Sequence, residues 1–191
     1  MVDERSPEQP ENAARILFVC YANHCRSPMM ELLLRDALDS SGGAAGLLVS
    51  SAGTHAQPGM PAHPYVVRAL AEHGVDATGW GATRLDPALV DASDLVLTAA
   101  AEQREEVVAL SPEAAGRTFT LLDFSAWLQA APATGPSEPT VPALLGRATA
   151  GRERHPDHRE RDLPDPMGRS LRHFRRCRRR VEAALVPFVG R

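Results

Sequence analysis

The feature that most constrains the fold is a short, continuously apolar run, ILFV at residues 16–19, which ends just before a polar loop. Branched and aromatic residues without polar alternation are typical of a strand that is covered on both faces. From Pro28 onward apolar residues recur at helical spacing, and the glycine pair at 42–43 predicts the end of this helix. This part of the chain therefore predicts a strand, a loop and a helix in that order.

The alternation of strand and helix patterns continues along the chain. Further strand patterns cover residues 47–52, 94–98 and 118–121, and helical patterns cover 63–73, 102–110 and 168–185, with a helical turn up to Trp127. Strands that alternate with helices form parallel sheets with helices packed against them. We therefore predict an α/β fold, a three-layer α/β/α sandwich around a central, mainly parallel four-stranded sheet.

The length of 191 residues favours a single domain. Residues 1–13 contain two prolines and no apolar periodicity, so we expect a mobile leader before a domain over 14–191. Residues 131–162 are rich in proline, glycine and mixed charge, which predicts either a disordered insertion or a functional flap.

The composition also bears on the compartment and on partners. No apolar run approaches the roughly 18–20 residues that a membrane-spanning helix needs, so no membrane partner is expected. Three cysteines, Cys20, Cys25 and Cys177, are too few for a secreted disulfide scaffold, which favours the cytoplasm.

The net charge of −3 is the sum of an acidic N-terminal part of the chain and a basic C-terminal part. Residues 1–146 carry 8 arginines against 18 acidic residues, and residues 147–191 carry 13 arginines against 6. The arginines of the last helix raise nucleic-acid binding as an alternative. The acidic remainder and the aromatic content of 5% argue against it, so a solvated face is the expected interpretation and no nucleic-acid partner is predicted.

A polar loop, CYANHCRS at residues 20–27, joins the first strand to the first helix. In an open α/β sheet this junction is where ligands bind. The five residues 21–25 can wrap so that their backbone N–H groups point inward, and the helix N-terminus adds partial positive charge. The sequence therefore predicts a phosphate-binding loop after the first strand.

The side chains of this loop suit nucleophilic chemistry on the bound phosphate. Arg26 would grip two phosphate oxygens with its planar guanidinium, and the same positive field would favour the nucleophilic thiolate of Cys20. Ser27 could donate its hydroxyl to that sulfur, and Asn23 tolerates the left-handed backbone of a tight turn. The alternative is that Cys20 and Cys25 are buried small residues and Arg26 is a surface charge.

At these residues the sequence resembles the low-molecular-weight protein tyrosine phosphatases. Their signature C-x-G-N-x-C-R-S-P matches residues 20–28 at every fixed position except the glycine, which is Ala22 here. A second match is SSAGT at 50–54, and a third is Asp165-Pro166, where the family keeps its general acid. The motifs follow in the family's order, and the resemblance covers most of residues 14–128 and 163–187.

The resemblance implies a cysteine-dependent phosphomonoester hydrolase that dephosphorylates phosphotyrosine in proteins through a phosphocysteine intermediate, with no metal and no cofactor. Catalysis would rest on Cys20 as the nucleophile, Arg26 as the oxyanion clamp, and Asp165 as general acid and then base. Without the family pattern, a helix cap before Pro166 would be the more common role for Asp165. The partner would be a phosphorylated protein or a small phosphate ester, and the chain would be a monomer or a weak dimer.

The resemblance also implies roles for the neighbouring residues. The predicted substrate-binding set consists of Tyr21, Ala22, Asn23, His24, Cys25 and Ser27. Ser51 would join the hydrogen bonds beneath the loop, although a simple strand-end hydroxyl fits as well. Cys25 would trap oxidised Cys20 as a reversible disulfide, or it packs in the core.

Departures from the family pattern concern the substrate. Met167 and Gly168 follow the Asp-Pro pair, where relatives that act on phosphotyrosine usually carry aromatic residues. His24 replaces a small aliphatic residue of the tyrosine phosphatases, or a threonine of the related arginine phosphatases, and it either reads substrate charge or points to solvent. Trp80 stands where relatives often carry a histidine that supports the loop, which predicts a packing role for Trp80 and support from elsewhere.

Other functions stay open on this scaffold. The main alternative is a phosphatase for a non-tyrosine or small-molecule phosphate ester. An arsenate reductase would need two further cysteines after the third strand, where this chain has TAAAE at 98–102. A non-catalytic phosphate-binding module would need neither a thiolate nor an acid, so the combination of Cys20, Arg26 and Asp165 argues against it.

Overall fold

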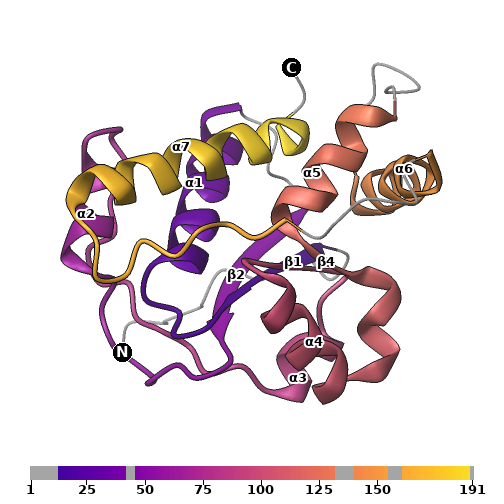
Figure 1. Ribbon diagram of the computed structural model, residues 1–191, viewed down its shortest axis with the longest axis horizontal. Helices are drawn as coiled ribbons and strands as arrows, with labels where there is room; N and C mark the ends of the chain where they lie inside the picture. The colour runs from indigo at the N-terminus through magenta and orange to yellow at the C-terminus, as the bar shows by residue number, and fades with distance from the viewer. Residues whose placement is uncertain (1–12, 42–45, 132–139, 155–160, 190–191) are drawn as a thin grey trace, which may run out of the picture.

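The computed structural model describes residues 13–41, 46–131, 140–154 and 161–189 (Figure 1). The strands are β1 (Ala14–Cys20), β2 (Leu47–Gly53), β3 (Leu95–Thr98) and β4 (Thr118–Thr120). The α-helices are α1 (Arg26–Ser41), α2 (Pro64–Ala71), α3 (Pro87–Asp91), α4 (Ala101–Leu110), α5 (Leu121–Ala130), α6 (Val141–Arg154) and α7 (Leu171–Leu185). Two 3-10 helices, η1 (Pro112–Arg117) and η2 (Val186–Phe188), complete the described elements. The predicted leader and the glycine pair at 42–43 lie, apart from residue 13, outside the described residues.

The four strands form one parallel sheet in the order β2-β1-β3-β4, as the alternation of patterns predicts. The register pairs Cys20 at the end of β1 with Gly53 at the end of β2, and Val19 with Thr98 at the end of β3. Because parallel strands end at the same edge of a sheet, the loops that follow β1, β2 and β3 meet there.

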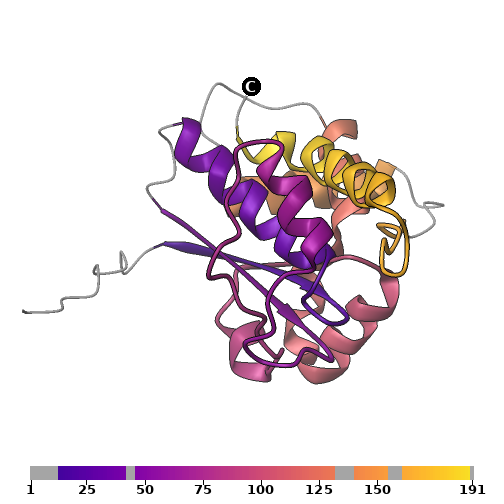
Figure 2. The same ribbon diagram turned by 90° about the vertical axis from the view of Figure 1, so that its left-hand side faces the viewer.

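Helices cover both faces of the sheet, which gives the predicted three layers (Figures 1 and 2). Ile16 and Phe18 of β1 pack into the larger core cluster, beneath α1, α5 and α7. Leu17 and Val19 pack into the smaller cluster on the other face, which contains residues of α3, α4 and η1. This alternation explains why β1 is apolar at every position from Ile16 to Val19: both of its faces are buried.

Some helix boundaries differ from the prediction for local reasons. Helix α1 begins at Arg26, two residues before the predicted proline. Helix α7 begins at Leu171 and not at Gly168, because Gly168 has a φ of +72° and Ser170 has the extended backbone of an N-cap. Helix α3 was not predicted; it has five residues, and the side chain of its N-cap, Asp86, accepts a hydrogen bond from the Leu89 amide. Among the described residues, no helix is long and apolar enough to cross a bilayer.

Part of the stretch predicted as a flap or a disordered insertion is a helix. Helix α6 buries Val141, Leu144 and Ala148 along one stripe and packs against α5. Arg147 donates to the Leu128 and Ala131 carbonyls, so it caps the last turn of α5. Residues 132–139 and 155–160 lie outside the described ranges, so for them the prediction stays a prediction.

Candidate active site

The loop between β1 and α1, residues 21–25, is held in its shape by Asn23 and Gly53. Asn23 has a φ of 49°, a left-handed backbone that asparagine tolerates better than most residues. Gly53 lies directly against the loop: a Cβ at this position would stand 2.5 Å from the Asn23 nitrogen and 2.7 Å from the Tyr21 oxygen. The end of β2 can therefore approach the loop only as glycine.

The loop turns its carbonyl groups outward. The carbonyls of Cys20, Tyr21 and His24 accept hydrogen bonds from the amides of Thr54 (3.0 Å), His55 (2.7 Å) and His63 (2.9 Å), respectively. In the described part of the chain, the backbone hydrogen bonds between the loop and the segments after β2 all use a carbonyl of the loop, and none uses a loop amide. These bonds leave the loop amides available, at the N-terminus of α1, to the kind of anion that the sequence predicts here.

Cys20 lies at the end of β1, buried beneath this loop. Its Sγ is 3.0 Å from the Oγ of Ser27. The Asn23 amide group donates to Ser27 Oγ (2.7 Å) and to Ser51 Oγ (2.8 Å), and its Oδ1 accepts from the Thr83 amide (2.7 Å). Ser27 Oγ accepts a hydrogen bond from Asn23, so its single proton can go either to the Ala52 carbonyl, 3.3 Å away, or to a thiolate at Cys20.

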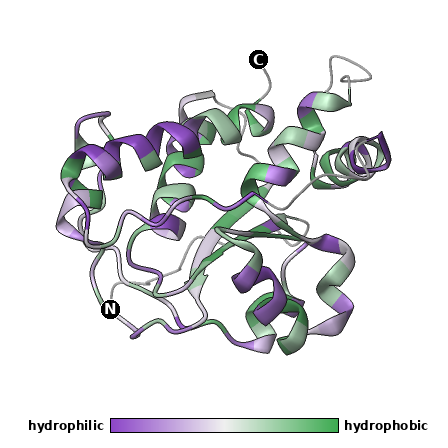
Figure 3. Cartoon of the chain, in the orientation of Figure 1, coloured by the Kyte–Doolittle hydropathy of each residue, from purple (hydrophilic) through white to green (hydrophobic). Residues whose placement is uncertain are grey.

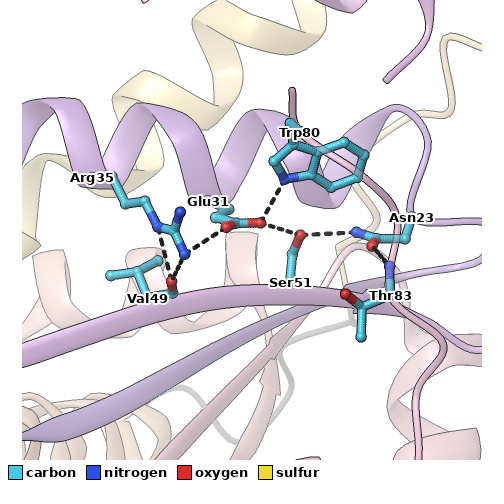
Figure 4. A network of polar contacts seen from close by, with 7 residues as sticks. All are labelled: Asn23, Glu31, Arg35, Val49, Ser51, Trp80 and Thr83. Carbon is cyan, nitrogen blue, oxygen red and sulfur yellow. Dashed lines mark hydrogen bonds and ion pairs between the residues drawn. The ribbon is translucent and has the colours of Figure 1, made fainter. Parts of the chain in front are cut away.

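The hydrogen bonds beneath the loop continue to Glu31 and Trp80, which the sequence did not link (Figure 4). Ser51 donates to Glu31 Oε2 at 2.5 Å, and the indole N–H of Trp80 donates to the same oxygen at 3.1 Å. Arg35 pairs with Glu31 Oε1 at 2.8 Å. Trp80 therefore supports the loop through Glu31 and Ser51, in addition to packing against the core.

Arg26, the first residue of α1, meets the chain segment that precedes α7. Its Nη2 lies 2.8 Å from Asp165 Oδ2, and its Nη1 donates to the Leu163 carbonyl at 3.4 Å. The Arg26 side chain is buried, whereas the Asp165 side chain is 47% exposed. The structure thus joins Arg26 to Asp165, two of the three residues that the sequence singles out for catalysis, and the third, Cys20, contacts Ser27, the residue after Arg26.

The segment with Asp165, residues 161–165, is tied to the same edge of the sheet at several points. The Leu163 amide donates to the Ala99 carbonyl at 2.7 Å, and Asp162 Oδ1 accepts from the Ala101 amide at 2.9 Å. The Arg161 amide donates to the Asp123 carboxylate at 3.1 and 3.3 Å. In Figure 1 this segment runs from the side of α5 to the start of α7. We call residues 161–165 the acid strap.

A stacked aromatic pair and an exposed methionine lie close in sequence to the residues of the candidate site. Tyr21 is 47% exposed and stacks on His55, with ring centroids 4.4 Å apart and ring planes 12° apart. Met167, two residues after Asp165, is 46% exposed. Tyr21 directly follows Cys20 in the chain, so the stacked pair presents an aromatic surface next to the end of β1.

His24 is oriented by a backbone group and lies against His63. Its Nδ1 lies 2.8 Å from the Pro61 carbonyl, which can only accept, so Nδ1 carries the proton. The rings of His24 and His63 meet edge to face at 5.3 Å, and His63 stacks on Phe174 of α7. Burial, followed by the charge of His24, lowers the pKa of His63 below its ordinary value of 6.5.

Cys25 and Cys177 are buried, free thiols. Burial raises the pKa of Cys25 to about 12, and the charges of Asp165, Cys20 and Cys177 contribute to the same rise. Burial likewise raises the pKa of Cys177 to about 12. Both groups therefore stay protonated at neutral pH. The predicted trapping role of Cys25 stays a prediction.

Comparisons with known proteins point to one family. A family model described as low molecular weight phosphotyrosine protein phosphatase matches residues 15–133. The chain is 42% identical over 106 residues to the probable low molecular weight protein-tyrosine-phosphatase EpsP of Ralstonia solanacearum, which covers 56% of this chain and 69% of that protein. It is 36% identical over 110 residues to a protein-arginine-phosphatase of Geobacillus stearothermophilus, which covers 58% of this chain and 70% of that protein.

Solved structures agree over a longer stretch. The YwlE arginine phosphatase from Geobacillus stearothermophilus superposes with a TM-score of 0.70 at 27% identity, over 92% of this chain and 90% of that one. The sequence match over 15–133 includes Cys20, Arg26 and Ser51 but not Asp165. For Asp165 the argument therefore depends on the geometry described above.

Proposed function

As a member of the low molecular weight phosphotyrosine protein phosphatase family, this chain is a cysteine-dependent phosphatase, and we propose that Cys20, Arg26 and Asp165 carry its reaction on phosphotyrosine in proteins. The observation that supports this assignment most is the ion pair of Arg26 with Asp165 at 2.8 Å, beside Ser27, whose Oγ lies 3.0 Å from Cys20 Sγ. The loop amides and Arg26 would hold the equatorial phosphate oxygens.

The first half-reaction transfers the phosphoryl group to sulfur. The Cys20 thiolate attacks phosphorus, an S–P bond forms, and the P–O bond to the leaving group breaks. Phosphate oxygens take over the guanidinium N–H groups that now contact Asp165, and the adjacent negative charge favours the protonated carboxyl group. Asp165 then gives its proton to the leaving oxygen.

The second half-reaction returns the enzyme to its starting state. Water attacks phosphorus and passes a proton to Asp165, the S–P bond breaks, and inorganic phosphate leaves. Ser27 would donate its hydroxyl proton to the sulfur and stabilise it as the leaving thiolate, which its distance of 3.0 Å allows.

For phosphotyrosine, the support is the stacked Tyr21–His55 pair at the loop mouth, a surface against which an aromatic ring can lie. The alternative substrate is a non-tyrosine phosphate. Phosphoarginine is the specific candidate, because similar proteins are named arginine phosphatases.

We also propose a cytoplasmic location and a monomeric or weakly dimeric state without nucleic-acid or membrane partners. A reducing compartment would keep the catalytic thiol and the two other free thiols reduced.

A test compares kcat/KM on a phosphotyrosyl peptide, a phosphoarginyl peptide of the same sequence and a small aryl phosphate, without added metal. We expect the phosphotyrosyl peptide to be preferred, Cys20→Ser to abolish turnover and Arg26→Ala nearly to do so. Asp165→Ala should slow the hydrolysis of substrates with poor leaving groups most, because good leaving groups need little protonation. Undiminished turnover by Cys20→Ser would refute the mechanism. A preference for the phosphoarginyl peptide would mean that phosphoarginine, and not phosphotyrosine, is the substrate.

A further inference from the structure

Helix α7 and the turn before it carry a row of exposed arginines that the catalytic machinery does not use. We call them the arginine face: Arg169, Arg172, Arg176, Arg179 and Arg180. Arg172, Arg176 and Arg179 follow at spacings of four and three residues, so they project from one side of the helix. Figure 3 shows the strongly hydrophilic colour along the outer side of this helix.

The arginine face differs in its contacts from the other arginines of α7. Arg175 donates to Glu72, the residue that follows α2, at 2.7 and 2.5 Å, and Arg178 pairs with Glu182. Within the described ranges, no carboxylate lies within ion-pair distance of any of the five guanidinium groups of the arginine face. These five positive charges are therefore available to an anion from outside.

The placement of these charges opposes the stability of the helix that carries them. Like charges three or four residues apart on one helix, as in Arg172–Arg176 and Arg176–Arg180, repel each other and destabilise the helix. The N-terminal end of a helix favours anions, yet α7 has Arg172 there and no acidic residue in its first turn, and no basic residue in its last turn. Such an arrangement is expected where an external partner supplies the missing negative charge.

The arginine face begins at the active site. Arg169 lies four residues after Asp165, and its amide donates to the Pro166 carbonyl at 3.0 Å, within the turn that leads to α7. From Arg172 to Arg180 the helix rises about 12 Å, the length of three to four residues of an extended peptide. A peptide whose phosphorylated residue occupies the loop can therefore place its flanking residues along α7.

We propose that the arginine face docks acidic or multiply phosphorylated sequence that flanks the phosphorylated residue of a protein substrate. This inference rests on the proposed function and specifies its substrate class. A long nucleic acid fits less well, because residues 1–146 carry 18 acidic residues against 8 arginines and the aromatic content is only 5%. A short acidic segment meets only the arginine face.

Two phosphotyrosyl peptides test the proposal, one with aspartate and glutamate at the flanking positions and one with asparagine and glutamine. We expect wild type to prefer the acidic peptide by about tenfold in kcat/KM at low salt, and the preference to shrink as salt is added. The double variant Arg172→Gln/Arg176→Gln should lose most of the preference. The control Arg15→Gln/Arg154→Gln removes two positive charges from exposed residues outside the arginine face, and it should keep the preference.

Two further measurements separate the possible failures. Hydrolysis of a small aryl phosphate should be the same in wild type and both double variants; if wild type itself fails here, the proposed function is wrong. Binding of the acidic peptide in unphosphorylated form, measured by fluorescence anisotropy, should weaken only in Arg172→Gln/Arg176→Gln. Equal peptide preference and equal binding in all three proteins would overturn the docking proposal, and so would salt-sensitive DNA binding that this variant alone loses while its peptide preference is unchanged.

Discussion

Gly53 shapes the candidate site although it carries no side chain. It is the fourth residue of the strand-end motif at 50–54, and the loop over residues 21–25 lies directly against it. The three atoms nearest to an added methyl group would all belong to the loop backbone, which cannot swing aside as a flexible side chain would. A larger residue at position 53 would therefore displace the loop backbone, including its amide groups.

We expect Gly53→Ala to displace the loop and to lower kcat/KM on a small aryl phosphate by at least about a hundredfold, because misplacement of a site by about 1 Å has costs of that order. Gly59→Ala is a useful comparison, since a Cβ there would meet nothing within 4 Å, although its φ of +78° brings some strain. Steady-state kinetics with a parallel melting curve measures both effects. Wild-type kinetics in Gly53→Ala would contradict the close approach.

At the scale of elements, the acid strap shows how a carboxyl group from a distant part of the chain is aimed at the loop. Leu163 is buried, its amide is bonded to Ala99 directly after β3, and its carbonyl is bonded to Arg26. Asp162 meanwhile accepts from the first amide of α4, a helix whose N-cap, Ala100, has no side-chain hydrogen bond to offer. The same contact thus caps a helix and fixes the strap.

Removal of this contact should affect proton donation more than phosphoryl transfer itself. We expect Asp162→Ala to lower kcat roughly tenfold for substrates with poor leaving groups and to leave good leaving groups nearly unchanged. Asp162→Asn keeps the accepting oxygen and should restore wild-type behaviour. A plot of log kcat against leaving-group pKa measures the effect. An equal loss for every leaving group in Asp162→Ala would assign the residue to stability alone.

The contact between α2 and α7 should make stability depend on pH through His63. Its Nδ1 accepts from the Tyr65 amide, so protonation there would break the cap of α2. Because burial and His24 lower the pKa of His63 in the folded state, the neutral ring is favoured. The contribution is fully present above the ordinary value of 6.5 and is lost as pH falls through the lowered folded pKa.

We therefore expect the free energy of unfolding to decrease more steeply below pH 6.5 in wild type than in His63→Asn, which still caps the helix but does not titrate. Denaturant unfolding at several pH values checks this. Parallel curves for the two proteins would exclude His63 as the source.

At the scale of the whole molecule, we propose that residues 14–191 form one domain of which α6 is an integral part. Gly151 of α6 lies against the backbone of Trp127 in α5, and Arg152 lies over the Trp127 ring, 5.8 Å from its centroid. Figure 1 places this pair of helices away from α2 and the start of α7. We therefore expect α6 to contribute to stability and to leave catalysis unaffected.

Two glycines of the same helix test this with opposite expected signs. A Cβ on Gly151 would press on the Trp127 backbone, so Gly151→Ala should destabilise the protein by about 1–3 kcal/mol. A Cβ on Gly146 would meet nothing within 4 Å, so Gly146→Ala should stabilise it by about 0.5–1 kcal/mol. Activity of both variants on an aryl phosphate at 25 °C should equal that of wild type. Equal stability changes would mean that α6 does not pack against α5 in solution.

The sequence predicts those parts of the structure that are determined by residues close to one another in the chain. The buried strand at 16–19, the turn at Asn23 and the helix after it follow from neighbouring residues. The bond from Trp80 to Glu31 spans 49 positions, and the one from Ala101 to Asp162 spans 61, so no periodicity reports them. Helix α6 has two glycines in its interior, which argue against a helix locally, and its packing on α5 outweighs them.

The catalytic candidates come from distant parts of the chain, since Cys20 ends the first strand and Asp165 precedes the last α-helix. During synthesis on the ribosome, the thiol and its phosphate cradle emerge long before the carboxyl group that protonates the leaving group. On the proposed mechanism, the complete set of reacting groups therefore exists only once the segment before α7 has been made and has docked onto Arg26.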